Sequence, residues 1–558
     1  MKFLKKYFEF IFAFLLIVIL FILKYPVLKL PYSWDVMNYV IPAAQFIYEN
    51  SFTIFLWNYS NGHPPFYFIL LGFVFKLFGN SQLVAHLVTL FFSFLAVYYT
   101  YLLGKFLFNR KIGIIASFLM FFSPTFFSHS GMSHTAIPLT ALSIISIYYF
   151  LKGNNFLYII FSSLLVLTEE RAIAIPLVLL FYKIFKEKKI NIKKNIILFV
   201  PILVFILWLL SNKLYYGYFL WPASSSLVSF NIIRVFLNAF MVLKNLFFDY
   251  YRWILTSFII ISCFSFKLLK DKKRILFSLI YPLILFVLMF NLPRLSIYFD
   301  KYFPHIIDYF IIVKEFSVLF ALLFFILILS FNKFFNFWNN KKIYPIYFTF
   351  IFMFLSYFLV IPFAPRYALP VYPIIFILFS LSLVKIFKKY SYVIFVILLI
   401  LFSTQWTGNH SDVGFVLEYN MEYVDAVKTH EMATHYLEKN FPDAVILVSY
   451  PQSLELQYPY LGYVEKPLNV ISIPPFPGLT SKNITISLNS DKYNKTIDLN
   501  SIDIIYSSDQ EFKTRYSREL NKILNKTLIK EFELNNKTVK IYEVDKSKTY
   551  PFYIVPMD

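Results

Sequence analysis

The sequence predicts a polytopic α-helical membrane protein with a C-terminal extracytoplasmic α/β domain. Hydrophobic residues make up 59% of the 558 positions, aromatic residues 22% and charged residues 15%, and the mean hydropathy is +0.64. A soluble chain of this length could not bury so much apolar surface. The long apolar runs end near Thr407. We therefore expect a transmembrane domain over residues 1–407 and a soluble domain over residues 408–558.

The charge distribution and the single cysteine exclude several classes of protein. The formal net charge is +21, but Lys and Arg stand in short stretches between apolar runs rather than on one basic face, so no nucleic-acid partner is expected. The lone Cys263 excludes a disulfide framework and a thiolate metal site.

The apolar runs predict about thirteen membrane spans, since each crossing needs about 20 apolar residues. They lie near 8–27, 80–103, 112–128, 135–151, 155–168, 171–185, 196–211, 253–269, 275–292, 316–331, 345–362, 369–384 and 391–407. The first run has no small-residue cleavage site after it, so we expect it to remain as a helix.

Positive charges set the predicted orientation. If the N-terminus is cytoplasmic, all basic stretches between spans fall on the cytoplasmic side, as the positive-inside rule requires; they begin at Lys2, Lys105, Lys152, Lys183, Lys270, Lys333 and Lys385. An odd number of spans then leaves the C-terminal domain outside. The prediction is a multi-pass protein of the plasma membrane.

Two parts of the chain are expected to lie outside the membrane on its outer face. The external loop 28–79 carries apolar stretches at 39–48 and 66–79 that are too short to cross, so we expect interfacial helices there. The C-terminal domain shows a helical pattern over 422–440 and β-rich runs at 444–448, 502–506 and 538–542. This alternation predicts the α/β fold, with a recognition or structural role.

The candidate site lies where polar residues meet the external ends of the spans. Asp35 is an isolated carboxylate beside a bilayer, which is a functional-site candidate by default. Burial in a partly dehydrated cleft is expected to raise its proton affinity. Arg366, Arg171 and Tyr367 are candidates for binding a phosphate, because a guanidinium offers a persistent charge and forked donors. The remaining pocket candidates are Trp34, Tyr39, His63, His134, Glu169 and Glu170.

A divalent metal is an open alternative. Asp35 and His63 offer oxygen and imidazole ligands, with the other histidines and the Glu pair nearby in the sequence. None of these spacings matches a helical His-x-x-x-His or paired-Cys site. No cofactor is therefore assigned.

Several motifs in order resemble one known family. They are Trp34-Asp35-x-x-x-Tyr39, His63-Pro64-Pro65-Phe66-Tyr67 with Leu77-Phe78-Gly79, Leu103-Gly104-Lys105-x-Leu107-Phe108, Ser123-Pro124 and Arg366-Tyr367-Ala368-Leu369-Pro370. Together they resemble the GT-C glycosyltransferases, closest to the protein-mannosyltransferase-like family 39, with the lipid A aminoarabinose transferases as relatives. The resemblance covers most of residues 1–405.

The resemblance implies a membrane glycosyltransferase with a GT-C-like fold. Such an enzyme transfers a hexosyl or pentosyl unit, with inversion, from a polyprenyl-phosphate donor, undecaprenyl or dolichyl, to a protein, lipid or glycan acceptor. The acidic residue of the first loop is the catalytic base in this family, and that role falls on Asp35. The donor's tail would lie in membrane lipid.

This chain departs from the family pattern at several positions, so other functions stay open. Val36 follows Asp35 where members have an acidic pair, and Ser133-His134-Thr135 stands where members have an Asp. Glu169, Glu170 and Arg171 stand where relatives have Thr-Lys, and could replace the missing charges. The alternatives are a transporter or flippase of lipid-linked saccharides and a non-catalytic GT-C-like protein. Transporters usually show internal repeats, which this sequence lacks.

Overall fold

The computed structural model describes residues 2–187, 196–222, 242–264, 349, 364–407, 419–473, 494–509, 522–550 and 552–556. The spans predicted at 275–292 and 316–331 lie outside these residues, as does the span at 345–362 apart from Thr349. The span predicted at 253–269 is described as far as Phe264.

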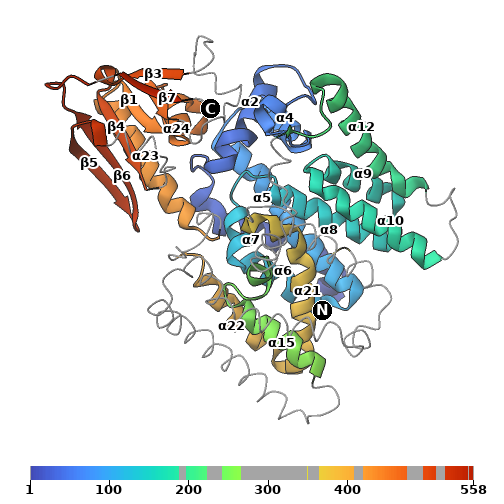
Figure 1. Ribbon diagram of the computed structural model, residues 1–558. Coiled ribbons are helices and arrows are strands. Elements are labelled where there is room, and N and C mark those ends of the chain that lie inside the picture. The colour runs from blue at the N-terminus through green and yellow to red at the C-terminus, as the bar shows by residue number, and fades with distance from the viewer. Residues whose placement is uncertain are drawn as a thin grey trace, which may run out of the picture.

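Helices make up the first part of the chain, as expected (Figure 1). The α-helices up to residue 403 are α1 (Lys2–Lys24), α2 (Ile41–Glu49), α3 (Trp57–Ser60), α4 (Phe66–Phe78), α5 (Gln82–Leu107), α6 (Arg110–Phe122), α7 (Pro124–His129), α8 (Ala136–Lys152), α9 (Asn155–Val166), α10 (Ala174–Glu187), α12 (Val200–Tyr216), α15 (Arg252–Phe264), α21 (Tyr372–Phe387) and α22 (Ser391–Ser403). Short turns include η1 (Tyr25–Val27), the π-helical η2 (Val36–Val40), η3 (Glu170–Ile173), η4 (Ile196–Phe199), η5 (Pro365–Val371) and η6 (Lys388–Tyr390).

Among the described residues, four helical stretches are long and apolar enough to cross a membrane. They are Tyr7–Val27, Gln82–Leu107, Ile196–Tyr216 and Pro365–Ser403. Shorter apolar helices occur at Phe66–Phe78, Ala136–Lys152 and Asn155–Val166. These helices agree with a membrane domain, whereas the span count and the orientation stay predictions.

Local sequence signals explain where the helices begin and end. The side chains of Ser81, Asn109 and Asn154 accept hydrogen bonds from the first-turn N–H groups of α5, α6 and α9. Gly153 ends α8 with a left-handed φ of 74°, so that α8 and α9 form a tight hairpin. These caps account for the close match between predicted and observed helices in this part of the chain.

Two predicted helices are interrupted. The span expected at 112–128 divides into α6 and α7, because Ser123 leaves the helical conformation and Pro124 starts a new helix. The interfacial helix expected at 39–48 is the second half of a longer stretch that begins as the π-turn η2 and continues as α2. Both corrections place irregular backbone close to the candidate site.

The C-terminal part forms a mixed sheet with helices (Figure 1). Its elements are α23 (Glu422–Asn440), β1 (Ile446–Ser449), α24 (Gln452–Gln457), η8 (Pro459–Leu461), β2 (Val470–Ile473), β3 (Asn494–Asp498), η9 (Leu499–Ser501), β4 (Ile504–Ser508), β5 (Lys526–Leu534), β6 (Lys537–Val544) and β7 (Phe552–Pro556). Strands β2 and β4 run parallel to β1, and β6 and β5 add in antiparallel order to give β2-β1-β4-β6-β5. Strands β3 and β7 form a separate antiparallel pair.

The C-terminal part is bonded to the loop between η1 and η2 by two hydrogen bonds to the backbone of Tyr32. The Tyr32 N–H donates to the Leu461 carbonyl at 3.2 Å, and the Tyr463 hydroxyl donates to the Tyr32 carbonyl at 2.9 Å. Tyr32 and Tyr463 are each 1% exposed. Both backbone polar groups of Tyr32, three positions before Asp35, are thus held by the C-terminal part.

Helices α5 and α6 approach each other through glycines. A Cβ on Gly104 would lie 2.8 Å from the Cα of Gly113, and a Cβ on Gly113 would overlap the Tyr101 carbonyl oxygen. Small residues at such crossings allow helix backbones to meet closely.

We expect Gly113→Val to destabilise the protein because its side chain must push α5 and α6 apart. Overpacking of this kind costs about 1–3 kcal/mol. Thermal unfolding in nanodiscs should show a lower midpoint for this variant than for Ser117→Ala on the same helix. Equal midpoints for the two variants would contradict the close helix contact.

Candidate active site

Asp35 lies where the loop after η1 turns into η2. Trp34, directly before it, has a left-handed φ of 46°, which is a strained conformation for a residue with a bulky side chain. The loop is held from the helical side by His86, whose Nε2 lies 3.1 Å from the Leu30 carbonyl and whose Nδ1 lies 3.2 Å from the Ser133 hydroxyl. The strained turn is therefore fixed on two sides, by α5 and by the C-terminal part.

Arg366 forms an ion pair with Asp35. Its Nη2 donates to the Asp35 Oδ2 at 2.5 Å, and its side chain is only 7% exposed. Arg366 lies on η5, which packs against α7 and α8 and so reaches the Asp35 loop from 331 positions away in the sequence. Asp35 keeps 32% of its side-chain surface exposed, so a substrate group can still approach it.

The predicted increase in the proton affinity of Asp35 is wrong for this arrangement. Burial does raise the pKa of the carboxyl, but the Arg366 guanidinium, with a smaller contribution from the nearby His134, outweighs burial and holds that pKa below its usual range. Asp35 is therefore a carboxylate at neutral pH and a weak base while Arg366 is bound to it.

His134 presents a defined tautomer to Asp35. The Ala136 N–H donates to His134 Nδ1 at 3.2 Å, which leaves the ring proton on Nε2. This Nε2 lies 2.8 Å from the Tyr39 hydroxyl and 3.9 Å from Asp35 Oδ2. Burial lowers the pKa of His134, in spite of the nearby carboxylate. His134 thus acts as a neutral donor that holds Tyr39 beside Asp35.

A second charged group lies on η3 and at the start of α4. His63 Nδ1 lies 3.0 Å from Glu170 Oε2, and Arg171 Nη2 lies 2.6 Å from Glu169 Oε1. Burial alone lowers the pKa of His63, but Glu170 raises it above its ordinary value; burial raises the pKa of Glu170, but His63 lowers it overall. His63 and Glu170 are therefore a charged pair at mildly acidic pH.

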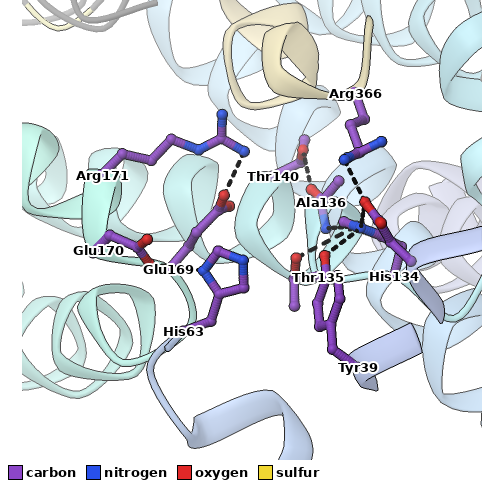
Figure 2. Close-up of polar contacts among 11 residues, drawn as sticks. Tyr39, His63, His134, Thr135, Ala136, Thr140, Glu169, Glu170, Arg171 and Arg366 are labelled. Carbon is purple, nitrogen blue, oxygen red and sulfur yellow. Dashed lines mark hydrogen bonds and ion pairs between the residues drawn. The ribbon is translucent and has the colours of Figure 1, made fainter. Parts of the chain in front are cut away.

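The two charged groups face each other across one site, with His63 beside Glu169 and Glu170 on one side and Tyr39, His134 and Arg366 on the other (Figure 2). Aromatic rings contact both groups. The guanidinium carbon of Arg171 lies 4.2 Å from the centre of the Tyr367 ring, and that of Arg366 lies 5.0 Å from the same centre. The Tyr39 and His63 rings have centroids 5.4 Å apart. The structure thus gathers the predicted residues from five separate segments, although their roles stay predictions.

A divalent metal was an open alternative, and it would need possible metal ligands that lie together among the described side chains. Among the described residues, His, Cys, Asp and Glu side chains form no group of three that could hold a metal ion. Asp35 bonds to Arg366 and His63 bonds to Glu170, so the two candidate ligands have different partners.

Sequence reasoning missed the contribution of the C-terminal part to this site. Tyr450 packs against the membrane core, and burial together with the Asp35 charge raises the pKa of Tyr450 to about 12. Tyr463 holds the Tyr32 backbone. The predicted domain boundary near residue 407 gave no reason to assign these tyrosines to a site formed by the first loop.

Comparison with solved structures gives weak likenesses. The chain is similar to ArnT from Cupriavidus metallidurans bound to undecaprenyl phosphate, with a TM-score of 0.48 and 10% identity over 95% of this chain and 98% of that chain. The apo state of the same protein gives a TM-score of 0.48 and 10% identity over 97% of this chain and 99% of that chain. The arabinofuranosyltransferase AftD from mycobacteria gives a TM-score of 0.42 and 11% identity over 96% of this chain and 40% of that chain.

Comparison of sequences gives a partial match. No curated protein matches the chain significantly. Residues 62–216 match a family model described as dolichyl-phosphate-mannose-protein mannosyltransferase. These residues include His63, His134, the Glu169–Arg171 segment and the glycine contact of α5 with α6. Over residues 62–216 the chain is therefore similar to the dolichyl-phosphate-mannose-protein mannosyltransferases, in agreement with the resemblance that the motifs within this range indicate.

Proposed function

We propose that this protein is a membrane glycosyltransferase that moves a sugar from a polyprenyl-phosphate donor to an acceptor hydroxyl. The observation that carries this proposal is the Asp35–Arg366 pair, with Arg171 nearby across the Tyr367 ring. The site is partly open. It holds a carboxylate, Asp35, that can accept a proton, and two guanidinium groups, Arg366 and Arg171, that can bind a phosphate. The family matched by residues 62–216 has a dolichyl-phosphate sugar in its description.

Exchange of ion-pair partners gives Asp35 its basicity. When the donor phosphate binds to Arg366, the guanidinium is shared between two anions and its effect on Asp35 weakens. Since burial raises the pKa of Asp35 once that opposing charge is reduced, donor binding turns a weak base into a stronger one. The base is thus activated only when the donor is present.

The transfer step is a direct displacement. The acceptor oxygen bonds to the anomeric carbon while the bond from that carbon to the donor phosphate oxygen breaks. The acceptor proton passes to Asp35, and the polyprenyl phosphate leaves as an anion neutralised by Arg366 and Arg171. Attack on the face opposite the leaving phosphate inverts the anomeric centre.

Orientation follows from the same proposal. The N-terminus lies in the cytoplasm, and the first loop and the residues from 408 onward lie outside, where the acceptor is a protein, lipid or glycan. The sugar itself is a hexosyl or pentosyl unit. His63, Glu169 and Glu170 form the pocket wall opposite Asp35, supported by the 5.4 Å contact between the Tyr39 and His63 rings.

Asp35→Asn should abolish transfer, because the amide cannot accept the acceptor proton, while donor binding is retained. We expect a loss of turnover of at least about 100-fold, as is typical for removal of a general base. Purified protein in nanodiscs, supplied with a panel of polyprenyl-phosphate monosaccharides, would report donor consumption and donor binding separately. Asp443→Asn, an exposed carboxylate exchange in the C-terminal part, is the matched control. Near-normal turnover by Asp35→Asn would overturn the assignment.

The His63–Glu170 pair should stabilise the protein in a limited pH range. His63 has a raised pKa, so its contribution is complete below about pH 6.5 and is lost as the pH rises through the folded-state value; Glu170 has a lowered pKa, so its contribution is lost only in acid. At pH 6 we expect His63→Gln to unfold about 1–3 °C below wild type, with the difference shrinking by pH 9. Exposed His435→Gln is the control, and a difference that grows with pH would contradict the pair.

Labelling would test the orientation. In a Cys263→Ser background, Asn536→Cys at the β5–β6 turn should react with an impermeant maleimide added to intact cells. Lys152→Cys, at the exposed end of α8, should react only after lysis. The opposite pattern would invert the proposed topology.

A further inference from the structure

One short motif of the sequence has no part in the site described above. The triplet Asn-x-Ser/Thr is the acceptor motif of N-glycosylation on external segments, and it begins at Asn58, Asn409, Asn483, Asn494, Asn525 and Asn536. All these triplets lie in segments that the charge pattern predicts to be external, and none begins in a predicted cytoplasmic loop. The motif is thus confined to the side of the membrane where a saccharide can be attached.

Three of the triplets are the same tripeptide, Asn-Lys-Thr. They begin at Asn494, Asn525 and Asn536, which lie in different local structures: the first residue of β3, the residue before β5, and the turn between β5 and β6. Because these structures place different demands on the backbone, no single turn or strand requirement accounts for the repeat. The repeat therefore points to a property of the tripeptide itself.

The fold distinguishes Asn536 from the other triplets that the structure describes. Asn58 lies within the helix α3, and Asn494 begins the paired strand β3. The Asn525 side-chain amide donates to Asp545 Oδ2 at 3.4 Å. Asn536 is exposed, and its side chain has no hydrogen-bond partner among the described residues. The fold thus leaves room for a bulky group on Asn536.

The β5–β6 turn explains why Asn536 is available. Leu534 pairs with Lys537, so the turn consists of Asn535 and Asn536, with left-handed φ values of 47° and 63°. Two positive φ values are typical of a type I′ turn, which Asn tolerates well. The Asn535 Nδ2 donates to Asp425 Oδ2 at 3.1 Å. One turn residue is therefore tied to α23, while the side-chain amide of the other stays in solvent.

The turn also ends the outermost strand of the described sheet. The strand order is β2-β1-β4-β6-β5, so β5 pairs on one side only within this sheet (Figure 1). Its Leu528 is 46% exposed. Open edge strands invite pairing with other chains, and natural proteins usually protect them. A saccharide is bulky and solubilising, so one attached beside the end of β5 would hinder such pairing.

We propose that Asn536 is a modification site that carries an N-linked saccharide. A separate transferase on the outer face takes the saccharide from a lipid-phosphate or lipid-diphosphate donor. The Asn536 Nδ2 bonds to the anomeric carbon while the bond from that carbon to the donor phosphate oxygen breaks; one amide hydrogen leaves as a proton, and the lipid phosphate leaves as an anion. Because Lys537 and Thr538 belong to β6, the triplet is recognised before the hairpin closes. The inference rests on the proposed orientation, which places this turn outside.

Variants of the same turn provide the test and its controls. The full-length protein is purified from the membranes of its own organism, and mass spectrometry measures the peptide that contains the turn. We expect wild type to show the added mass of a saccharide on Asn536, and both Asn536→Gln and Thr538→Val to lose that mass completely. Asn535→Gln, which changes the other turn residue, and Thr538→Ser, which preserves the triplet, should retain it.

The outcomes separate this inference from the proposed function. An unmodified Asn536 in wild type, or a saccharide that persists in Thr538→Val, would overturn the inference. External labelling of Asn536→Cys in intact cells, with no saccharide on wild-type Asn536, would leave the orientation intact and refute the modification site alone. Labelling only after lysis would refute both. Donor consumption by wild type and Asp35→Asn reports on the transferase independently, and Asn536→Gln should consume donor as wild type does.

Discussion

The ion pair between Asp35 and Arg366 is the contact on which the rest of the site depends. It joins the loop after η1 to η5 over 331 sequence positions with an N–O distance of 2.5 Å. A partly buried carboxylate without this partner would be costly, because burial disfavours its charge. The pair therefore fixes the strained loop in place and sets the protonation state of the group proposed as the base.

The surrounding residues show how several charges share a small space. Arg366 pairs with Asp35, Arg171 with Glu169 and His63 with Glu170, so each ionic side chain has an opposite partner within 3.0 Å. Tyr367 and Tyr39 separate these pairs while remaining in contact with them. Such an arrangement can admit a phosphate by changing partners, because no charge must be left alone at any stage.

The sequence predicted much of the helical fold, and the structure brings the candidate site residues together, although their roles stay predictions. The apolar runs near 80–103 and 135–151 and the helical pattern over 422–440 correspond to α5, α8 and α23. The outer-face argument named Asp35, His134 and Arg366 together because external helix ends must lie near one another. The sequence did not show which of these residues pair, and so the predicted increase in the pKa of Asp35 was wrong. Burial beside apolar spans can be expected from the sequence, but the position of the Arg366 guanidinium cannot.

The contribution of the C-terminal part shows a second kind of limit. Tyr32 is bonded through its backbone N–H and carbonyl, and backbone groups are present at every residue, so no sequence pattern distinguishes this one. The consequence is mechanical. Because Tyr32, Trp34 and Asp35 are consecutive parts of one strained loop, a shift of the Leu461–Tyr463 segment must move the carboxylate relative to Arg366.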